Sequence, residues 1–227
     1  MTAFFVTATG TDIGKTFVSA GLIEHFRAAG RVVDAIKPVV SGFDPQSWKA
    51  PASDPAVLLA ALGRPVTLAE AERISPWRFK APLSPDQAAQ HEGRAIVFQD
   101  VVEFCRQTIA GCRGVLLIEG IGGTMVPLDD RRTVLDLMSV LRIPIILVAG
   151  SYVGTISHTL TALEVLARRN INIAAVAVSE SAASAATLAD TVAALQRFGG
   201  GIDIVGIARR TPGNDVAPAF AQLAALL

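Results

Sequence analysis

Residues near the N-terminus have the types and the order needed to bind the phosphates of a nucleotide. The segment Thr9 to Thr16 reads Thr-Gly-Thr-Asp-Ile-Gly-Lys-Thr. Glycines let the backbone bend so that several N–H groups point at one anion. The Lys15 ammonium can then reach the β- and γ-phosphates, and the Thr16 hydroxyl is suited to hold Mg²⁺. The segment predicts a site for a nucleoside triphosphate.

The segment departs from the strict phosphate-loop pattern G-x-x-x-x-G-K-[ST] at one position. The pattern requires glycine at position 9, where this chain has Thr9, and its glycine is Gly10 instead. A bare Gly-Lys-Thr tripeptide would more often be a chance sequence on a turn. Here an apolar run, Phe4 to Val6, precedes the loop, and apolar residues at helical spacing follow it from Phe17 onward. This order predicts a strand, a phosphate loop and a helix.

Two further candidate residues follow predicted strands. Arg31 to Ile36 predicts a strand that delivers Lys37 at its carboxyl end, where ligands of open parallel sheets bind. We interpret Lys37 as an anion contact rather than a surface lysine. Val115 to Ile118 predicts a central strand with two apolar faces, and Glu119 follows it before a run of glycines. Glu119 is either a metal contact, as P-loop enzymes have at that place, or a solvated residue on a glycine-rich turn.

Two other features are less specific. Asp54 lies in the polar loop Phe43 to Pro55, just before a helical pattern, and its spacing favours a helix N-cap over a metal ligand. The loop Gly150 to Thr155 opens another predicted helix, whose start is a potential site for a substrate carboxylate. The apolar face of that helix is predicted to hold Ile156, Leu160, Leu163 and Ala167.

These residues need a scaffold that brings strand ends together. Further strands are predicted at residues 144–148, 173–178 and 202–207, and helical patterns alternate with them. Six or seven strands alternating with helices predict a P-loop NTPase-like α/β fold, with a doubly wound, mostly parallel sheet of about seven strands. No repeat or linker divides the chain, so we expect one domain over residues 1–227.

Composition narrows the classes of function. The chain has 227 residues, 51% apolar and 18% charged, which suits one large core. Twenty basic and twenty acidic residues balance, which argues against binding nucleic acid or a membrane surface through charge. Cys105 and Cys112 lack partners at metal-ligand spacing and indicate thiols of a reducing compartment. We expect a cytoplasmic protein that acts on small molecules, since no leader segment or membrane-length apolar run is visible.

Five motifs, read together, resemble one family. In chain order they are Thr9–Thr16, Lys37–Gly42, Ala81–Pro85, Glu92–Ile96 and Glu119–Gly123. The chain closely resembles the dethiobiotin synthetases over nearly its whole length. In that family the enzyme closes a cyclic urea in biotin biosynthesis from 7,8-diaminopelargonate, CO₂ and ATP. A carbamate forms on one amine, ATP phosphorylates it, and the second amine expels phosphate. The resemblance implies an ATP-dependent cyclo-ligase that releases ADP and phosphate.

The resemblance also implies residue roles. Catalytic positions are matched by Lys37, Lys15, Thr11 and Ser41; nucleotide-binding positions are matched by Asp12, Ile13, Gly14, Lys15, Thr16 and position 17, which is Phe17. Mg²⁺ positions are matched by Thr16, Asp54 and Glu119, so the resemblance makes Asp54 a metal ligand rather than a cap. The segment Gly150–Ser157 matches a region that holds the substrate carboxylate across a two-fold interface, which implies a homodimer.

The chain departs from the family pattern at four positions. Ala8 stands where a loop glycine is usual, so its backbone must avoid positive φ, and Asp86 replaces a common histidine. Ser179 occupies the place of a strand-end asparagine that reads adenine, and Ala208 replaces a common proline. A serine hydroxyl cannot pair with two base atoms at once, as an amide can. We therefore predict weaker selectivity for the nucleotide base than ATP-specific relatives have.

Other classes of protein share these signals. A ParA/MinD-like nucleotide-dependent switch ATPase has the same fold, but such proteins typically carry a second lysine early in the loop. An amidating synthase of corrin biosynthesis would need an additional glutamine-hydrolysing domain. A small-molecule kinase stays open at this point, because a phosphate loop alone cannot name the acceptor.

Overall fold

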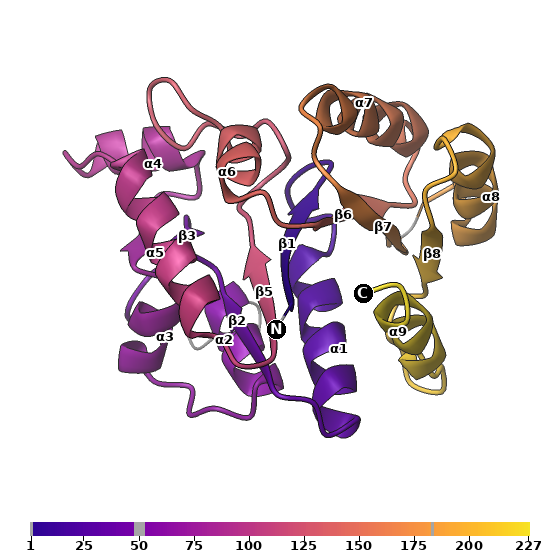
Figure 1. Ribbon diagram of the computed structural model, residues 1–227, viewed down its shortest axis with the longest axis horizontal. Coiled ribbons are helices and arrows are strands. Elements are labelled where there is room, and N and C mark those ends of the chain that lie inside the picture. Colours follow the sequence, from indigo (N-terminus) through magenta and orange to yellow (C-terminus); the bar gives the residue numbers. More distant parts are fainter. Residues whose placement is uncertain (1, 48–52, 183) are drawn as a thin grey trace.

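A six-stranded parallel sheet forms the centre of the computed structural model (Figure 1), which describes residues 2–47, 53–182 and 184–227. The strands of this sheet run in the order β2-β5-β1-β6-β7-β8, and every neighbouring pair is parallel. Their bounds are β1 Thr2–Ala8, β2 Val33–Ile36, β5 Val115–Glu119, β6 Ile145–Gly150, β7 Ile173–Ser179 and β8 Ile204–Ile207. The predicted fold class is confirmed, with six strands in the main sheet rather than about seven.

Helices cover both faces of the sheet (Figure 1). Their bounds are α1 Lys15–Ala28, α2 Asp54–Ala61, α3 Leu68–Ile74, α4 Pro85–His91, α5 Phe98–Gly111, α6 Val134–Leu141, α7 Thr155–Arg168, α8 Leu188–Phe198 and α9 Ala217–Ala224. Helix α1 packs against both α2 and α9, whereas α5 packs against α6 and α7 against α8. Within the described part of the chain, no helix is long and apolar enough to cross a membrane.

The strands form where apolar residues run without interruption. All five residues of β5 and all six of β6 are buried, as strands covered by helices on both faces require. In the register of the sheet, Val6 lies opposite Glu119, and Gly150 lies opposite Ser179. Because parallel strands end at one edge, the loops that follow β1, β5, β6 and β7 meet there.

Two short strands lie outside the main sheet. Strands β3 (Val39–Val40) and β4 (Trp77–Arg78) form a separate parallel pair. Backbone hydrogen bonds extend this pairing, since Gly42 N–H donates to the Ala81 carbonyl oxygen and Phe43 N–H donates to that of Phe79. The pairing brings the segment after Lys37 beside the Pro-containing connection at residues 75–85. Positions 48–52 of the predicted Phe43 to Pro55 loop lie outside the described residues.

Helix α7 buries a different face from the predicted one. Of the four predicted apolar residues, Leu163 is buried, but Ile156 is 38% exposed and Ala167 is exposed. The buried face consists of Thr155, Thr159, Ala162, Leu163 and Leu166. Thr155 and Thr159 can be buried because each hydroxyl donates to a backbone carbonyl, that of Gly150 and that of Thr155. The periodicity of apolar residues could not reveal that these two threonines are buried, because their burial depends on hydrogen bonds to carbonyl oxygens.

Close packing of α1 against α9 depends on a glycine. A Cβ atom placed on Gly21 would lie 2.0–2.4 Å from three ring atoms of Phe220. We expect Gly21→Ala to lower the free energy of unfolding by about 1–3 kcal/mol, as overpacking of a core does. The matched control is Gly111→Ala, at the end of α5, where an added Cβ meets nothing within 4 Å. Urea denaturation of both variants tests this, and equal stabilities would contradict it.

Candidate active site

The phosphate loop connects β1 to α1 at the carboxyl edge of the sheet. Ala8 ends β1 without a positive φ, which confirms that prediction, and Gly14 is the N-cap of α1 with φ 106°. A side chain at Gly14 would also clash, since its Cβ would lie 2.6 Å from Ser179 Oγ. Gly123 packs against the loop from the other side, where an added Cβ would lie 3.2 Å from Gly10 Cα. The backbone path therefore requires glycine at position 14, and a side chain at position 123 would crowd the loop.

Lys15 lies at the start of α1 and points back over the loop. Its side chain is buried, with 6% of the residue exposed, and Nζ donates to the Gly10 carbonyl oxygen at 3.2 Å. Burial, followed by the charge of Lys37, lowers the pKa of Lys15 to about 8. An ammonium that lacks a carboxylate partner at hydrogen-bond distance is available to a phosphate.

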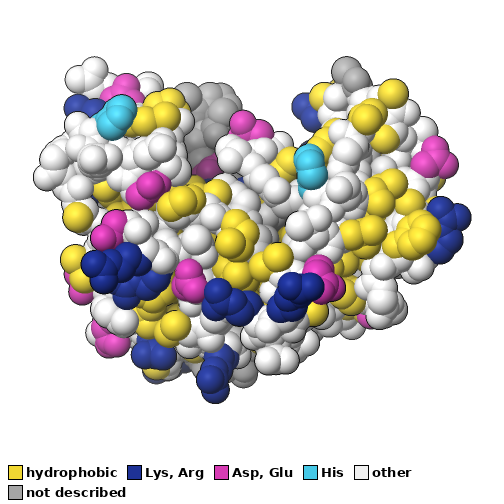
Figure 2. All heavy atoms as spheres, turned by 90° about the horizontal axis from the view of Figure 1, so that it is seen from above, with side chains coloured by type: hydrophobic (Ala, Val, Ile, Leu, Met, Phe, Trp, Pro, Cys, Tyr) yellow, Lys and Arg dark blue, Asp and Glu magenta, His cyan; other side chains and the backbone are white. Residues whose placement is uncertain are grey.

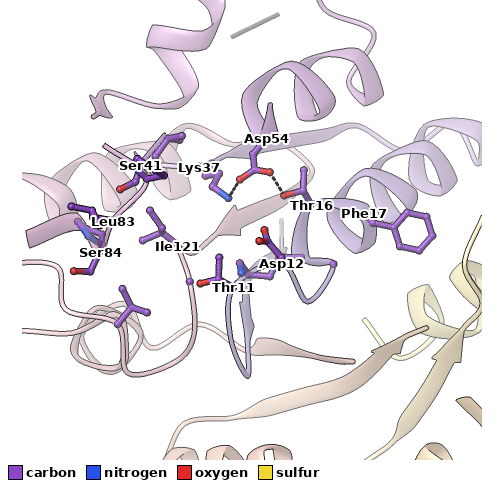
Figure 3. Close-up of a pocket in the computed structure, with 17 residues that line it drawn as sticks. Thr11, Asp12, Thr16, Phe17, Lys37, Ser41, Asp54, Leu83, Ser84 and Ile121 are labelled. Carbon is purple, nitrogen blue, oxygen red and sulfur yellow. Dashed lines mark hydrogen bonds and ion pairs between the residues drawn. The ribbon is translucent and has the colours of Figure 1, made fainter. Parts of the chain in front are cut away.

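Lys37, Asp54 and Glu119 form a charge cluster, and Figure 3 shows Lys37 and Asp54 next to Thr16. Lys37 Nζ donates to Asp54 Oδ2 and to Glu119 Oε1, the latter at 2.7 Å. Burial alone would lower the pKa of Lys37, but the Glu119 and Asp54 carboxylates outweigh it and raise that pKa. Burial would likewise raise the pKa of Asp54, and the nearby Lys37 ammonium holds it below its ordinary value.

Asp54 is not the N-cap of its helix, so the prediction from spacing was wrong. It is the first residue of α2, Ser53 is the N-cap, and Ser53 makes no side-chain capping bond. The Asp54 carboxylate instead accepts from the Thr16 hydroxyl at 2.8 Å and from Lys37. Spacing could not reveal this, because the partners are 38 and 17 residues away in sequence.

The oxygens around Thr16 fit a hard divalent cation. Thr16 Oγ1 lies 2.8 Å from Asp54 Oδ1 and 2.7 Å from Glu119 Oε1, although one hydroxyl proton can serve only one acceptor. Neighbouring ligands of octahedral Mg²⁺ lie about 2.9 Å apart, given Mg–O distances of about 2.0–2.1 Å. The second Glu119 oxygen, Oε2, is buried without a hydrogen-bond partner. Among the described residues no three His, Cys, Asp or Glu side chains cluster, so phosphate and water oxygens would complete such a site.

A cavity of about 750 Å³ extends from the phosphate loop to the end of β3. Its lining combines Lys37 and Asp54 with the hydroxyls of Thr11, Ser41 and Ser84, as Figure 3 shows. Ser41 Oγ is buried and has no hydrogen-bond partner. The apolar part of the wall comes from Val40, Leu83, Ile121 and Val126 with Pro82 and Pro85. The cavity thus joins anion-binding groups to walls suited to an aliphatic chain.

Of the predicted site residues, Thr11, Asp12, Gly14, Lys15, Thr16, Phe17, Lys37, Ser41 and Asp54 line this main cavity. Ile13 lines a neighbouring cavity of about 410 Å³, together with Ser179, Glu180, Arg209 and Arg210. Glu119 contacts the site through Lys37 and Thr16.

The neighbouring cavity contains two arginines that the sequence did not single out. The backbone N–H of Arg209 donates to Glu180 Oε2 at 2.8 Å. The Arg210 guanidinium lies over the Phe17 ring and forms an ion pair with Glu24 at 2.9 Å. The only signal available was the position of these arginines directly after the last strand. The fold alone brings that strand end beside the phosphate loop.

Helix α7 borders a third cavity, of about 510 Å³, whose lining includes Thr9, Thr11, Met125 and His158. His158 Nδ1 lies 2.9 Å from the Tyr152 hydroxyl. Two hydrophobic side chains of this region are exposed: Met125, which lines the cavity, by 55%, and Val153, just before α7, by 77%. Figure 2 shows exposed hydrophobic side chains on the face that carries α4, α6 and α7.

Comparisons with known proteins give consistent results. Residues 2–212 match a family model described as an AAA domain. The chain is 51% identical over 180 residues to the ATP-dependent dethiobiotin synthetase BioD of Acidiphilium cryptum, covering 79% of this chain and 80% of that protein. It is 44% identical over 226 residues to the protein of the same name from Methylobacterium nodulans, covering 96% and 100%.

Solved structures with this fold are more distant in sequence. A MinC:MinD cell division protein complex from Aquifex aeolicus aligns with TM-score 0.60 and 10% identity, covering 99% of this chain and 94% of that chain. A ParA family ATPase from Chlorobium tepidum aligns with TM-score 0.55 and 9% identity, covering 99% and 97%. These alignments show a shared fold and carry no inference about function.

Proposed function

Because this chain belongs to the ATP-dependent dethiobiotin synthetase family, it is an ATP-dependent ligase, and we propose how its own residues carry the reaction. The substrates would be 7,8-diaminopelargonate, CO₂ and ATP. The observation that carries the assignment of roles is the main cavity, where the phosphate loop, Lys37 and an apolar wall meet. The switch ATPases that share the fold, at 9–10% identity, give no support for a switch function.

The phosphate loop and Lys15 would bind the triphosphate. Backbone N–H groups at the start of α1 attract the phosphates, and Lys15 would exchange its bond to the Gly10 carbonyl for a phosphate oxygen. Asp12 and Gly14 line both the main and the neighbouring cavity, and Ile13 lines the neighbouring one. These three residues would therefore border the nucleoside. The nucleobase would then lie near Ser179 and the Phe17 ring.

Phosphoryl transfer would take place between the loop and Lys37. A carbamate oxygen attacks the γ-phosphorus, the bond to the β,γ-bridging oxygen breaks, and ADP leaves. The second amine then attacks the carbamic-phosphate carbon and phosphate departs. Two anions must approach each other in the first step, so Lys15 and Lys37 would offset their repulsion. Thr11 and Ser41 would donate hydrogen bonds to the carbamate and phosphate, for which the free Ser41 hydroxyl is suited.

Thr16, Asp54 and Glu119 would hold Mg²⁺, in accordance with the spacing of their oxygens. When bound, the ion would neutralise charge on the β- and γ-phosphates. Lys37 contacts both carboxylates and would help to keep them beside Thr16.

Phosphate release by the purified protein tests this function. With Mg²⁺, ATP and bicarbonate, release is expected to depend on diaminopelargonate, and mass spectrometry should detect the cyclic urea. Omission of the diamine is the control. Release that is indifferent to the diamine would overturn the proposed reaction and favour a nucleotide switch.

The base of the nucleotide is expected to matter less than in ATP-specific relatives. A site whose polar groups all hydrogen-bond the correct substrate can reject an analogue that lacks those bonds by about 10⁴–10⁵-fold. Here Ser179 offers a single hydroxyl, next to Gly14. We expect turnover with CTP or GTP within about 100-fold of that with ATP. Side-by-side kcat/KM values for the three nucleotides measure this, and a preference for ATP above about 10⁴ would contradict it.

We also propose a homodimer through the face at the start of α7. The exposed side chains of Val153, just before α7, and of Met125, which lines the third cavity, support this proposal. We expect Val153→Asp to convert a dimer into a monomer in sedimentation velocity. Val32→Asp is the matched control, since Val32 is 67% exposed but lies before β2. A wild-type monomer, or a dimeric Val153→Asp variant, would contradict the proposal. A cytoplasmic location stays a prediction.

A further inference from the structure

A cation of the protein itself, the Lys37 ammonium, contacts both carboxylates of the site. Lys37 Nζ donates to Asp54 Oδ2 and to Glu119 Oε1, and Thr16 Oγ1 contacts the same Glu119 oxygen at 2.7 Å. Lys37 is 3% exposed and Glu119 is 1% exposed. The ammonium therefore lies where the proposed metal ligands converge.

If Glu119 Oε1 held both Lys37 and a bound Mg²⁺, the two cations would lie close together in a buried site. An octahedral Mg²⁺ ligand lies about 2.0–2.1 Å from the ion, and an ammonium 2.7 Å from the same oxygen would then stand close to a doubly charged ion. Repulsion between the two cations is large in a buried site. This repulsion favours displacement of the ammonium when the metal ion binds.

We propose that Lys37 is the resident cation of this site, which keeps Asp54 and Glu119 in place until a divalent cation arrives with the nucleotide and displaces it. The displaced ammonium has space to move into, since Lys37 lines the cavity of about 750 Å³ beside Ser41. Lys37 would thus be a positioning residue for the metal ligands in the free protein and a phosphate contact in the loaded one. The inference rests on the proposed metal site.

Charge balance gives the exchange a direction. Asp54 and Glu119 carry two negative charges, which Lys37 offsets by one. A divalent cation offsets both and brings phosphate anions with it, so the released ammonium gains new partners. A divalent cation without nucleotide offers Lys37 no such partner. We therefore expect weak binding of the metal alone and strong binding of the metal with nucleotide.

Binding of Mn²⁺, measured by calorimetry and by its paramagnetic resonance signal, tests the competition. Without nucleotide, Lys37→Met should bind Mn²⁺ at least tenfold more tightly than the wild type, and Lys37→Arg, which keeps the charge, should stay close to the wild type. Lys15→Met is the matched control, since Lys15 is buried nearby but bonds to the Gly10 carbonyl. Without nucleotide, the affinity of Lys15→Met for Mn²⁺ should exceed that of the wild type by threefold or less. Equal affinities of Lys37→Met and the wild type would overturn the inference.

A second measurement uses the wild-type chain, in case Lys37→Met does not fold. The chain has four lysines, Lys15, Lys37, Lys49 and Lys80, so ¹⁵N spectra of the ammonium groups are simple to assign with single arginine variants. The Lys37 signal should be protected from exchange in the free protein and should shift when Mg²⁺ and ADP bind. An unchanged Lys37 signal in that complex would overturn the inference. Failure of Mn²⁺ to bind even with ADP would overturn the metal site itself.

Discussion

Replacing Lys37 with methionine is expected to lower kcat for diamine-dependent phosphate release by about 10²–10³-fold, which is the usual effect of removing one preorganised group that stabilises a transition-state charge. Lys37 is buried at the cavity wall, and the proposed reaction brings a carbamate and a triphosphate together beside it. Methionine has a similar length but no charge, so the repulsion between the two anions would no longer be offset. The readout is kcat at saturating ATP and diamine.

The KM for ATP should change much less than kcat, because Lys15 and the loop would still hold the triphosphate. The matched control is Lys80→Met, which removes an exposed lysine far from the loop in sequence and should retain the wild-type rate. Removal of one member of a buried ion pair also destabilises proteins, by about 3–5 kcal/mol. Assays therefore belong at a temperature where circular dichroism shows a folded variant. A kcat within threefold of the wild type would contradict the assigned role.

Nucleotide affinity is expected to fall about tenfold per pH unit above pH 8. Burial and the neighbouring Lys37 lower the pKa of Lys15 to about 8 in the free protein. A bound triphosphate would favour the charged lysine and raise that pKa, so binding takes up a proton between the two values and weakens as pH rises. From pH 8 to pH 10 the loss would reach about 100-fold. Titration calorimetry with ATP across this range measures it.

Lys15→Met should bind ATP weakly at all pH values, and its affinity should not fall with pH in this way.

The titration of Lys15 also changes the free energy of unfolding. An unfolded Lys15 keeps its ordinary pKa of 10.5, so between about pH 8 and 10.5 the unfolded chain binds more protons and the free energy of unfolding rises with pH. The rise, relative to Lys15→Met, would be up to about 3 kcal/mol. Parallel stability profiles of the two proteins would show that Lys15 has an ordinary pKa.

The sequence was sufficient for the features that depend on neighbouring residues. The order of Phe4 to Val6, the glycine-containing loop and the residues after Lys15 identified β1, the phosphate loop and α1, because strand, turn and helix patterns act over a few residues. Continuous apolar runs identified the buried strands β5 and β6 for the same reason. The family resemblance rested on motifs of this local kind, and relatives at 44–51% identity confirmed it.

Only the tertiary structure decided how distant residues combine. The spacing of Asp54 alone favoured a helix cap, whereas the fold places its carboxylate beside Thr16 and Lys37. The threonines of α7 are buried because their hydroxyls donate to backbone carbonyls. Arg209 and Arg210 reach the nucleotide side only because β8 ends near the loop. The reason is the same in each case. Burial, charge pairing and hydrogen bonding depend on neighbours in space, and a parallel sheet brings together strand ends that lie over a hundred residues apart, such as Val6 and Glu119.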